Sequence, residues 1–503
     1  MHKYKAFRPK PACALTLLLG CIGASGASPS QEEMWEVIKQ QQRIIEELKG
    51  KLDKTEAKVV ETDEKVEAAA EAIEDVSPAP SWADRVHIGG YGSIRGEVND
   101  LEEESDTFTF RRFVLTADAH VTDRLQTYLE LEFERFAELE LEKEISAEPG
   151  EFEAKQVVEG TDGSEIALEQ AWARYVIDPA LNFEMGAVLV PLGRFNILHD
   201  DNQWNLTRRP LVDRGAEVLP SPAAWPELGI GFTGGVPLTG GGLLDYRLYA
   251  VNGVQLDLEF EQEIKSEDGM TETVVEAEFE PSQGTFSKDL NDGKAVAGRL
   301  AYKPVPGHEI AVSGYYGRYT PEFLDDESVW SVGLDGLNTF AGLELEYEFI
   351  HTDWGDVEDV IADFERVVPT LAGEGTVGTI KSEAEFAVSG LSKSRTGYWL
   401  EMRYPLQPTW LQESILGRGF ANPLLEPTFR FEQVFFNGVD NDADLHRATL
   451  GLAYRPLPTW AFALAGEYTW TNEDSLDGLT NFINAAEDED DAFAATVGVA
   501  FAF

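Results

Sequence analysis

Cysteine, histidine and basic residues are scarce in this chain of 503 residues. Both cysteines, Cys13 and Cys21, fall within the first 27 residues, so the remainder can form neither a disulfide nor a thiolate site for catalysis or zinc. Only 7 histidines are present, which leaves few candidates for histidine-based chemistry. The 40 Lys and Arg face 91 Asp and Glu, for a formal charge of −51. Such a chain would be repelled by nucleic acid, and we expect no nucleic-acid partner.

Long hydrophobic runs are also missing beyond the N-terminus, where no stretch approaches the roughly 18 apolar residues of a membrane-spanning helix. Residues 1–27 have the pattern of a secretory signal peptide. Basic residues come first, the apolar core Ala14–Ile22 follows, and small residues lead to a cleavage site after Ala27. Cleavage before Cys21, as in a lipoprotein, is the alternative, although Leu19 is a poor residue for that signal.

A heptad repeat occupies residues 30–77. Its apolar positions are spaced by seven without interruption: Ile38, Ile45, Leu52, Val59, Val66 and Ile73. This pattern predicts an α-helical coiled coil, and the mixture of side chains in its two seams favours a trimer. An amphipathic helix packed on the rest of the protein is the alternative. Pro78 and Pro80 end the helix, and residues 78–85 form a linker.

Apolar residues alternate with polar ones from Val86 onward, in segments of about ten residues. In one of these, Leu129 and Leu131 point one way while Glu130 and Glu132 point the other. A strand with one lipid-facing and one water-facing side needs this period, but so does a strand of a soluble sandwich. The connections between the segments therefore decide the fold class.

About sixteen such segments are joined by connections that alternate between short and long. The short ones are 122–124, 178–179, 239–242, 304–307, 335–338 and 456–458. The long ones are 99–106, 138–164, 191–228, 253–293, 319–327, 351–394, 437–445 and 471–491, and 406–425 is long where a short one is expected. Tight turns at one rim and long loops at the other are typical of bacterial outer-membrane barrels. We therefore predict an all-β transmembrane barrel of about 16 antiparallel strands over residues 86–503, preceded by the α-helical coiled coil in the periplasm.

The last predicted strand, Ala492–Phe503, carries apolar residues at every second position and ends on an aromatic residue. This pattern is an assembly signal of outer-membrane barrels. We expect outer-membrane lipid around the barrel, and recognition of this strand by the barrel assembly machinery through Phe503.

A barrel of about sixteen strands is too wide for side chains to fill, so a water-filled interior is predicted. The loop 191–228 is rich in charged residues and would set the channel constriction if it folds inward. An external loop paired within itself is the alternative. The candidate constriction residues are Arg194, His199, Asp200, Asp201, Arg208, Arg209 and Arg214.

The predicted inward face of the strands mixes both signs of charge. The candidate lumen-facing residues are Arg112, Glu130, Glu132, Glu134, Arg174, Glu344, Glu346, Arg430 and Arg447. They could guide ions or, as paired charges, only hold the wall rigid. The sequence shows no serine-hydrolase, nucleotide-binding or zinc-protease motif, and we predict no catalytic residue, no metal site and no cofactor.

Several motifs resemble those of the phosphate-selective porin (O and P) family. They are Phe110–Phe113, Leu168–Tyr175, Gly186–Arg194 and Arg208–Val212, and the resemblance covers mainly residues 86–235. It implies a sixteen-stranded trimeric porin, and some relatives with an N-terminal coiled coil pass dicarboxylates. Phosphate-selective members line their channel with Lys and Arg, whereas this chain is rich in acids. Cation preference and general diffusion therefore stay open.

These features together predict a porin in the bacterial outer membrane through which small hydrophilic solutes or ions diffuse passively. The expected oligomer is a homotrimer. The alternative is a structural envelope protein, in which the coiled coil ties the outer membrane to peptidoglycan and the barrel is chiefly an anchor.

Overall fold

The computed structural model describes residues 85–101, 106–135, 139–148, 151–160, 165–267, 270–282, 286, 291–360, 362–363, 366, 380–383, 392–438, 442–473, 475–476, 479 and 489–503. All of them belong to the second of two compact units, Trp82–Phe503. The predicted signal peptide and coiled coil, and the linker up to residue 84, lie outside the described residues. Among the described residues, no helix is long and apolar enough to cross a membrane.

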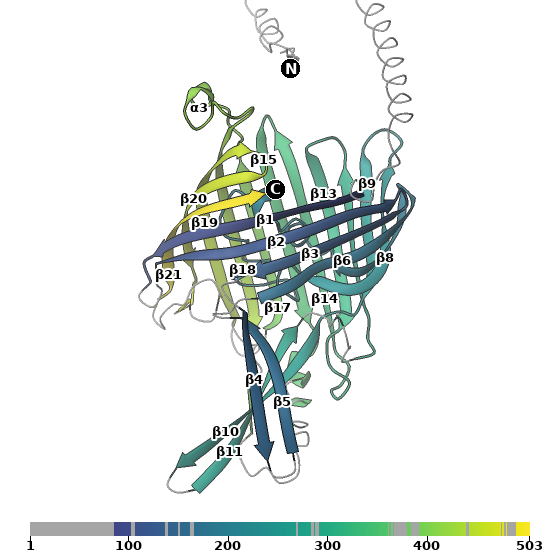
Figure 1. The fold of residues 1–503 in the computed structure, drawn as a ribbon, viewed down its shortest axis with the longest axis vertical. Coiled ribbons are helices and arrows are strands. Elements are labelled where there is room, and N and C mark those ends of the chain that lie inside the picture. The colour runs from purple at the N-terminus through teal and green to yellow at the C-terminus, as the bar shows by residue number, and fades with distance from the viewer. Residues whose placement is uncertain are drawn as a thin grey trace, which may run out of the picture. The chain divides into compact units, whose positions relative to one another are not determined.

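Sixteen strands form one closed barrel, in which each barrel strand pairs with the next barrel strand in chain order (Figure 1). The barrel strands are β1 (Val86–Asn99), β2 (Thr107–Thr122), β3 (Leu125–Glu134), β6 (Glu165–Asp178), β7 (Leu181–Leu189), β8 (Pro226–Pro237), β9 (Leu243–Val251), β12 (Ala295–Lys303), β13 (His308–Arg318), β14 (Ser328–Phe340), β15 (Leu343–Trp354), β17 (Ser392–Arg403), β18 (Leu424–Gly438), β19 (Asp442–Leu457), β20 (Trp460–Trp470) and β21 (Asp491–Ala502). The predicted fold class, an antiparallel barrel of sixteen strands, is confirmed; the coiled coil stays a prediction.

The connections hold the remaining elements. Two small sheets lie outside the barrel order, one of β4 and β5 and one of β10, β11 and β16. Their bounds and those of the short helices are β4 (Leu139–Glu148), β5 (Glu151–Gly160), β10 (Gln255–Glu267), β11 (Met270–Ser282), β16 (Ile380–Glu383), η3 (Phe195–Ile197), η4 (Asp201–Gln203) and α3 (Thr409–Glu413).

Strands β1 and β21 close the barrel. They pair antiparallel from Tyr91 with Ala502 to Asn99 with Ala494. The pairing extends to Phe503, whose N–H donates to the Gly90 carbonyl at 3.0 Å. Because the two ends of the barrel sequence satisfy each other's backbone groups, no edge strand remains in the barrel.

The two faces of the barrel wall differ in chemistry as the alternation predicts. On β20, Phe462 and Leu464 are exposed on the outer face, at 42% and 60%, while Ala463 and Glu467 between and beyond them are buried. On β3, Leu129 is exposed and Glu130 is buried. An apolar outer face and a polar inner face are what a wall standing in lipid requires.

The alternation of short and long connections is present, with two corrections. The turn predicted at 335–338 is wrong, because these residues continue β14 and pair with β15, and the turn follows at Ala341 and Gly342. Asp335, which reads as a turn residue, is held on the inner face by Arg299, whose Nε lies 3.0 Å from Oδ2. The connection predicted over 437–445 is only 439–441, since Asn437 pairs with Asp442 across the two strands.

Candidate functional site

Residues 190–225 join β7 to β8, and we call them the inner segment. Its two ends are fastened together. The Val190 N–H donates to the Trp225 carbonyl at 3.0 Å, and the Asn196 side chain binds both residues, donating to the Val190 carbonyl and accepting from the Trp225 N–H. The segment thus leaves the wall and returns to it at adjacent points, which lets the chain between them fold as a separate layer.

The inner segment reaches strands all around the barrel. Near its start the Gly193 N–H donates to Ser313 of β13 at 3.1 Å. Further along, Asp201 pairs with Arg112 of β2 at 3.2 Å. Thr207 shares a hydrogen bond of 2.7 Å with Thr496 of β21. Strands so far apart in a closed barrel can be touched by one segment only if it crosses the interior.

An apolar core fastens the segment inside the barrel. Phe195 and Trp204 pack with ring centroids 4.7 Å apart, and Trp204 meets Trp399 of β17 edge-on at 5.8 Å. The wall makes room with small residues where the chain approaches it closely. A Cβ on Gly451 would lie 2.4 Å from Leu206, and one on Gly498 would lie 2.8 Å from Thr207.

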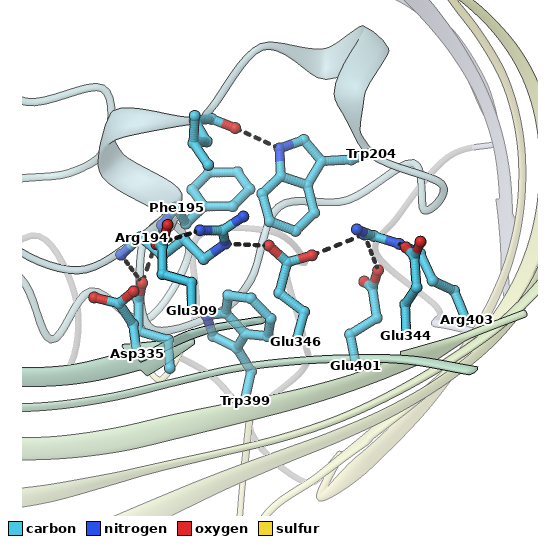
Figure 2. Close-up of polar contacts among 12 residues, drawn as sticks. Arg194, Phe195, Trp204, Glu309, Asp335, Glu344, Glu346, Trp399, Glu401 and Arg403 are labelled. Carbon is cyan, nitrogen blue, oxygen red and sulfur yellow. Dashed lines mark hydrogen bonds and ion pairs between the residues drawn. The ribbon is translucent and has the colours of Figure 1, made fainter. Parts of the chain in front are cut away.

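Alternating charges run from Arg194 across the wall (Figure 2). Arg194 binds Glu309 of β13 at 2.8 Å and also Glu346 of β15. Glu346 in turn accepts from Arg403 of β17 at 2.8 Å, and Arg403 binds Glu344 at 2.7 Å. Each carboxylate therefore lies between two guanidinium groups or beside one, as buried charges require.

A second charged row lies on β18 and β19. Glu432 binds Arg447 at 2.6 Å and Arg430 at 3.2 Å, and all three side chains are nearly or fully buried. This row also holds the main chain of the inner segment. Arg430 donates to the Arg208 carbonyl and Arg447 to the Arg209 carbonyl, at 2.7 and 2.6 Å.

The middle of the inner segment carries ion pairs of its own with the wall. Arg208 binds Glu467 of β20 at 2.6 Å and also Glu97 of β1. Arg214 binds Glu134 of β3 at 3.0 Å. These pairs are buried or half-buried, so their charges are compensated by the wall rather than by water.

His199 is fully buried, and its Nε2 lies 3.5 Å from Glu169 of β6. Burial alone would lower the pKa of His199, but the Glu169 carboxylate outweighs it and raises the pKa to about 10. Asp213 is also buried and accepts from the Trp399 indole at 3.2 Å. Burial and then the Glu348 carboxylate raise the pKa of Asp213 well above its usual value.

The other side of the interior is open. A cavity of about 440 Å³ lies between the turn at Ile197 and Leu198 and the strands β6–β9, β12 and β13. Five basic side chains and two acidic ones line it: Arg174, Arg194, Arg247, Arg299, Lys303, Asp245 and Glu309. Arg247 is exposed to this cavity, and among the described residues it has no ion-pair partner.

The structure brings the candidate residues together in different ways. Most candidate wall residues are buried and contact the inner segment or one another, namely Arg112, Glu130, Glu132, Glu134, Glu346, Arg430 and Arg447. Arg174, bound to Glu184 at 2.6 Å, and Glu344 are half-exposed. Asp200 accepts from Gln203 within the segment at 2.8 Å, and Asp201 lies 3.7 Å from Arg209.

Sequence reasoning missed the acidic partners and the open side. Glu169, Glu348 and Glu467 were not among the candidates, although each binds the inner segment. Glu348 and Glu467 lie at inward positions of the alternation, whereas Glu169 is turned inward by a bulge in β6. Arg247 and Lys303 of the cavity were also missed. Their inward phase in β9 and β12 is the signal that could have found them.

No family model matches the chain. An uncharacterised protein of Aquifex aeolicus is 27% identical over 217 residues, which are 43% of this chain. The chain thus spans 39% of the length of that relative. The resemblance to the phosphate-selective porin family stays a prediction.

Solved barrels are similar in architecture. An anion-selective porin of Comamonas acidovorans has a TM-score of 0.47 at 11% identity, covering 83% of this chain and 99% of the porin. OmpT of Vibrio cholerae in its trimer form has a TM-score of 0.45 at 10% identity, covering 84% and 100%. The channel DcaP of Acinetobacter baumannii has 0.44 at 10%, covering 83% and 97%. At these values the similarity says nothing about the solute.

Proposed function

We propose that this chain is an outer-membrane porin through which small hydrophilic solutes and ions diffuse passively. The observation that carries the proposal is the closed sixteen-strand wall, apolar outside and charged inside, with a cavity of about 440 Å³ left beside the inner segment. A closed barrel satisfies every strand's backbone within lipid, and a polar interior of this width admits water.

In this proposal the solute passes through the barrel along the side of the interior that holds the cavity. Most of its basic side chains are paired with acids, but Arg247 is exposed and has no ion-pair partner among the described residues, so it offers a solute an uncompensated positive charge although the whole chain is acidic. A low-dielectric wall lined by one sign of charge concentrates ions of the other sign. Small anions are therefore the favoured solutes of this stretch, which fits the resemblance of residues 86–235 to the phosphate-selective porin (O and P) family.

Planar bilayers test the proposal. Purified full-length protein is expected to give stable single-channel steps, and a salt gradient should give a reversal potential of the sign that marks anion preference. A bilayer that stays silent at protein levels where a known porin conducts would sink the porin function. Stable single-channel steps with a reversal potential that marks cation preference would support the porin function. They would contradict the proposed anion path along the cavity.

The envelope context is part of the same proposal. We place the barrel in the outer membrane as a homotrimer, with the residues 30–77 as a periplasmic coiled coil and Phe503 as part of the signal read by the assembly machinery. Mass measurement in detergent should give three chains. The alternative, a tether to peptidoglycan, is tested by co-sedimentation with cell wall, which a variant lacking 30–77 would lose.

A further inference from the structure

Three buried side chains from distant parts of the sequence meet beside the inner segment. They are Glu130 of β3, Glu169 of β6 and His199, each at most 3% exposed. One carboxylate oxygen from each acid and one imidazole nitrogen lie within 4.8 Å of one another. Its three side chains are not among those that line the cavity of the proposed solute path.

A bulge in β6 creates this meeting. Glu130 pairs with Gln170 while the next residue, Leu131, pairs with Leu168, so Glu169 is the extra residue of its strand. In a regular strand neighbouring side chains point to opposite faces, and Glu169 would then face lipid when Gln170 faces inward. The bulge turns both inward, and bulges commonly re-aim a side chain at a functional site.

The imidazole of His199 directs its Nε2 into the cluster. Its Nδ1 lies 3.1 Å from the Asn196 carbonyl, an acceptor, so Nδ1 carries a proton. Nε2 is buried and, within the part of the chain that the structure describes, makes no hydrogen bond, although the Glu169 carboxylate lies 3.5 Å away. A metal-binding histidine has this arrangement, with one nitrogen donating to a backbone carbonyl and the other left for the ion.

Neighbouring side chains outside the cluster also hold the two carboxylates in position. Gln170 Nε2 donates to one oxygen of Glu130 at 2.5 Å, and Tyr91 lies 3.4 Å from one oxygen of Glu169. The other oxygen of Glu169 is the one that faces His199. Each acid thus has an outer contact that fixes its orientation, as ligating carboxylates do.

We propose that Glu130, Glu169 and His199 bind one divalent transition-metal ion, with Zn²⁺ as the best fit. One imidazole and two carboxylates suit zinc, and no softer ligand is needed. Tetrahedral zinc with bonds of about 2.0–2.2 Å holds its donors roughly 3.3 Å apart. The His199 to Glu169 distance of 3.5 Å is close to this value.

Charge also favours a divalent ion at this position. It brings two positive charges to two buried carboxylates. Leaving a carboxylate buried without compensation is costly. Arg112 of β2 already binds Glu132 at 2.7 Å and Asp201 at 3.2 Å. The ion would pin the inner segment to β3 and β6.

Zinc titration of the full-length protein, refolded without metal in detergent, tests the proposal. We expect one Zn²⁺ per chain by calorimetry and by elemental analysis after dialysis. His199→Gln and Glu169→Gln should each weaken binding by more than the roughly 10–100-fold that loss of an outer contact costs. The matched control is His446→Gln, because His446 lies 3.2 Å from the single carboxylate of Asp444. It should bind zinc as the unsubstituted protein does.

Co²⁺ spectra keep the test decisive if a glutamine variant does not fold. His199→Cys should add a thiolate-to-cobalt charge-transfer band, because cobalt at the site would bind the new thiolate. Expression of residues 28–503 removes Cys13 and Cys21, so no other thiol can produce this band. Absence of one-equivalent binding, unchanged binding in folded His199→Gln protein, or loss in His446→Gln would overturn the site. None of these measurements uses conductance, so their failure would contradict the metal site without contradicting the porin function.

Discussion

The two sides of the barrel interior use the same kinds of charged residue differently. On the side of β17–β21, Arg430, Glu432 and Arg447 are buried, paired and bound to the inner segment. On the side of β8–β13, Arg247 and Lys303 line a cavity. The first arrangement fixes a segment in place, and the second leaves charge available to a solute. Accessibility, and not the number of charges, therefore marks the proposed path.

Removing the inner segment should have the largest effect. Since Val190 and Trp225 are hydrogen-bonded, a short Gly-Ser linker can replace residues 191–224. Single-channel conductance is expected to rise several-fold, because a sixteen-strand barrel without the inner segment holds a wide aqueous pore. Deletion of 481–488 in the β20–β21 connection serves as the control. Equal conductance of the shortened and intact proteins would contradict an inner segment that fills one side.

Breaking the buried row on β18 and β19 should cost stability. Glu432→Leu leaves Arg430 and Arg447 buried without their shared carboxylate, at a cost of about 3–5 kcal/mol. Urea unfolding in micelles measures it. Adding Arg447→Met to Glu432→Leu should recover part of the loss. A double variant less stable than the single one would show that the row does not act through paired charge.

Reversing one charge on the cavity side should change selectivity and leave stability nearly intact. Arg247→Glu is expected to move the reversal potential toward cations, because the side chain is exposed to the cavity. The unfolding free energy should change by no more than about 0.5 kcal/mol. Arg124→Glu, in the exposed β2–β3 turn, is the matched control and should leave the reversal potential unchanged.

The smallest substitution adds one methyl group on each side. Gly498→Ala would place its Cβ 2.8 Å from Thr207, in the packed half, and should cost about 1–3 kcal/mol. Gly235→Ala, on the cavity side, meets the Asp245 carboxylate at 2.9 Å, and that flexible group can move away. Thermal unfolding of both variants measures the difference. Equal destabilisation would remove the contrast in packing between the two sides.

Much of the wall could be predicted from the sequence because lipid and water impose a strict alternation on each strand. Leu464 outside and Glu467 inside follow from that period alone. The turn at 335–338 was misplaced because Asp335 and Gly336 read as turn residues. Asp335 is instead an inward residue of β14 whose carboxylate binds Arg299, from a strand whose position no local pattern reveals.

The interior was less predictable because its contacts join residues far apart in the chain. Charge in the loop 191–228 suggested the region, but whether it lies inside depends on partners such as Ser313 and Glu467. Glu130, Glu169 and His199 meet only through a bulge and the path of the inner segment. The three residues are not at the spacing of any known metal-binding motif, so no metal site could be predicted from the sequence.

The wall holds the inner segment at several points by its main chain. Arg430 and Arg447 bind carbonyl oxygens, Glu432 accepts from the Leu211 N–H at 2.8 Å, and Glu348 accepts from the Phe195 N–H at 3.0 Å. A hydrogen bond to a backbone carbonyl or N–H does not depend on which side chain the residue carries. Those side chains of the segment that do not themselves bind the wall can therefore change, by evolution or by design, to suit a different solute while the anchoring residues of the wall stay the same.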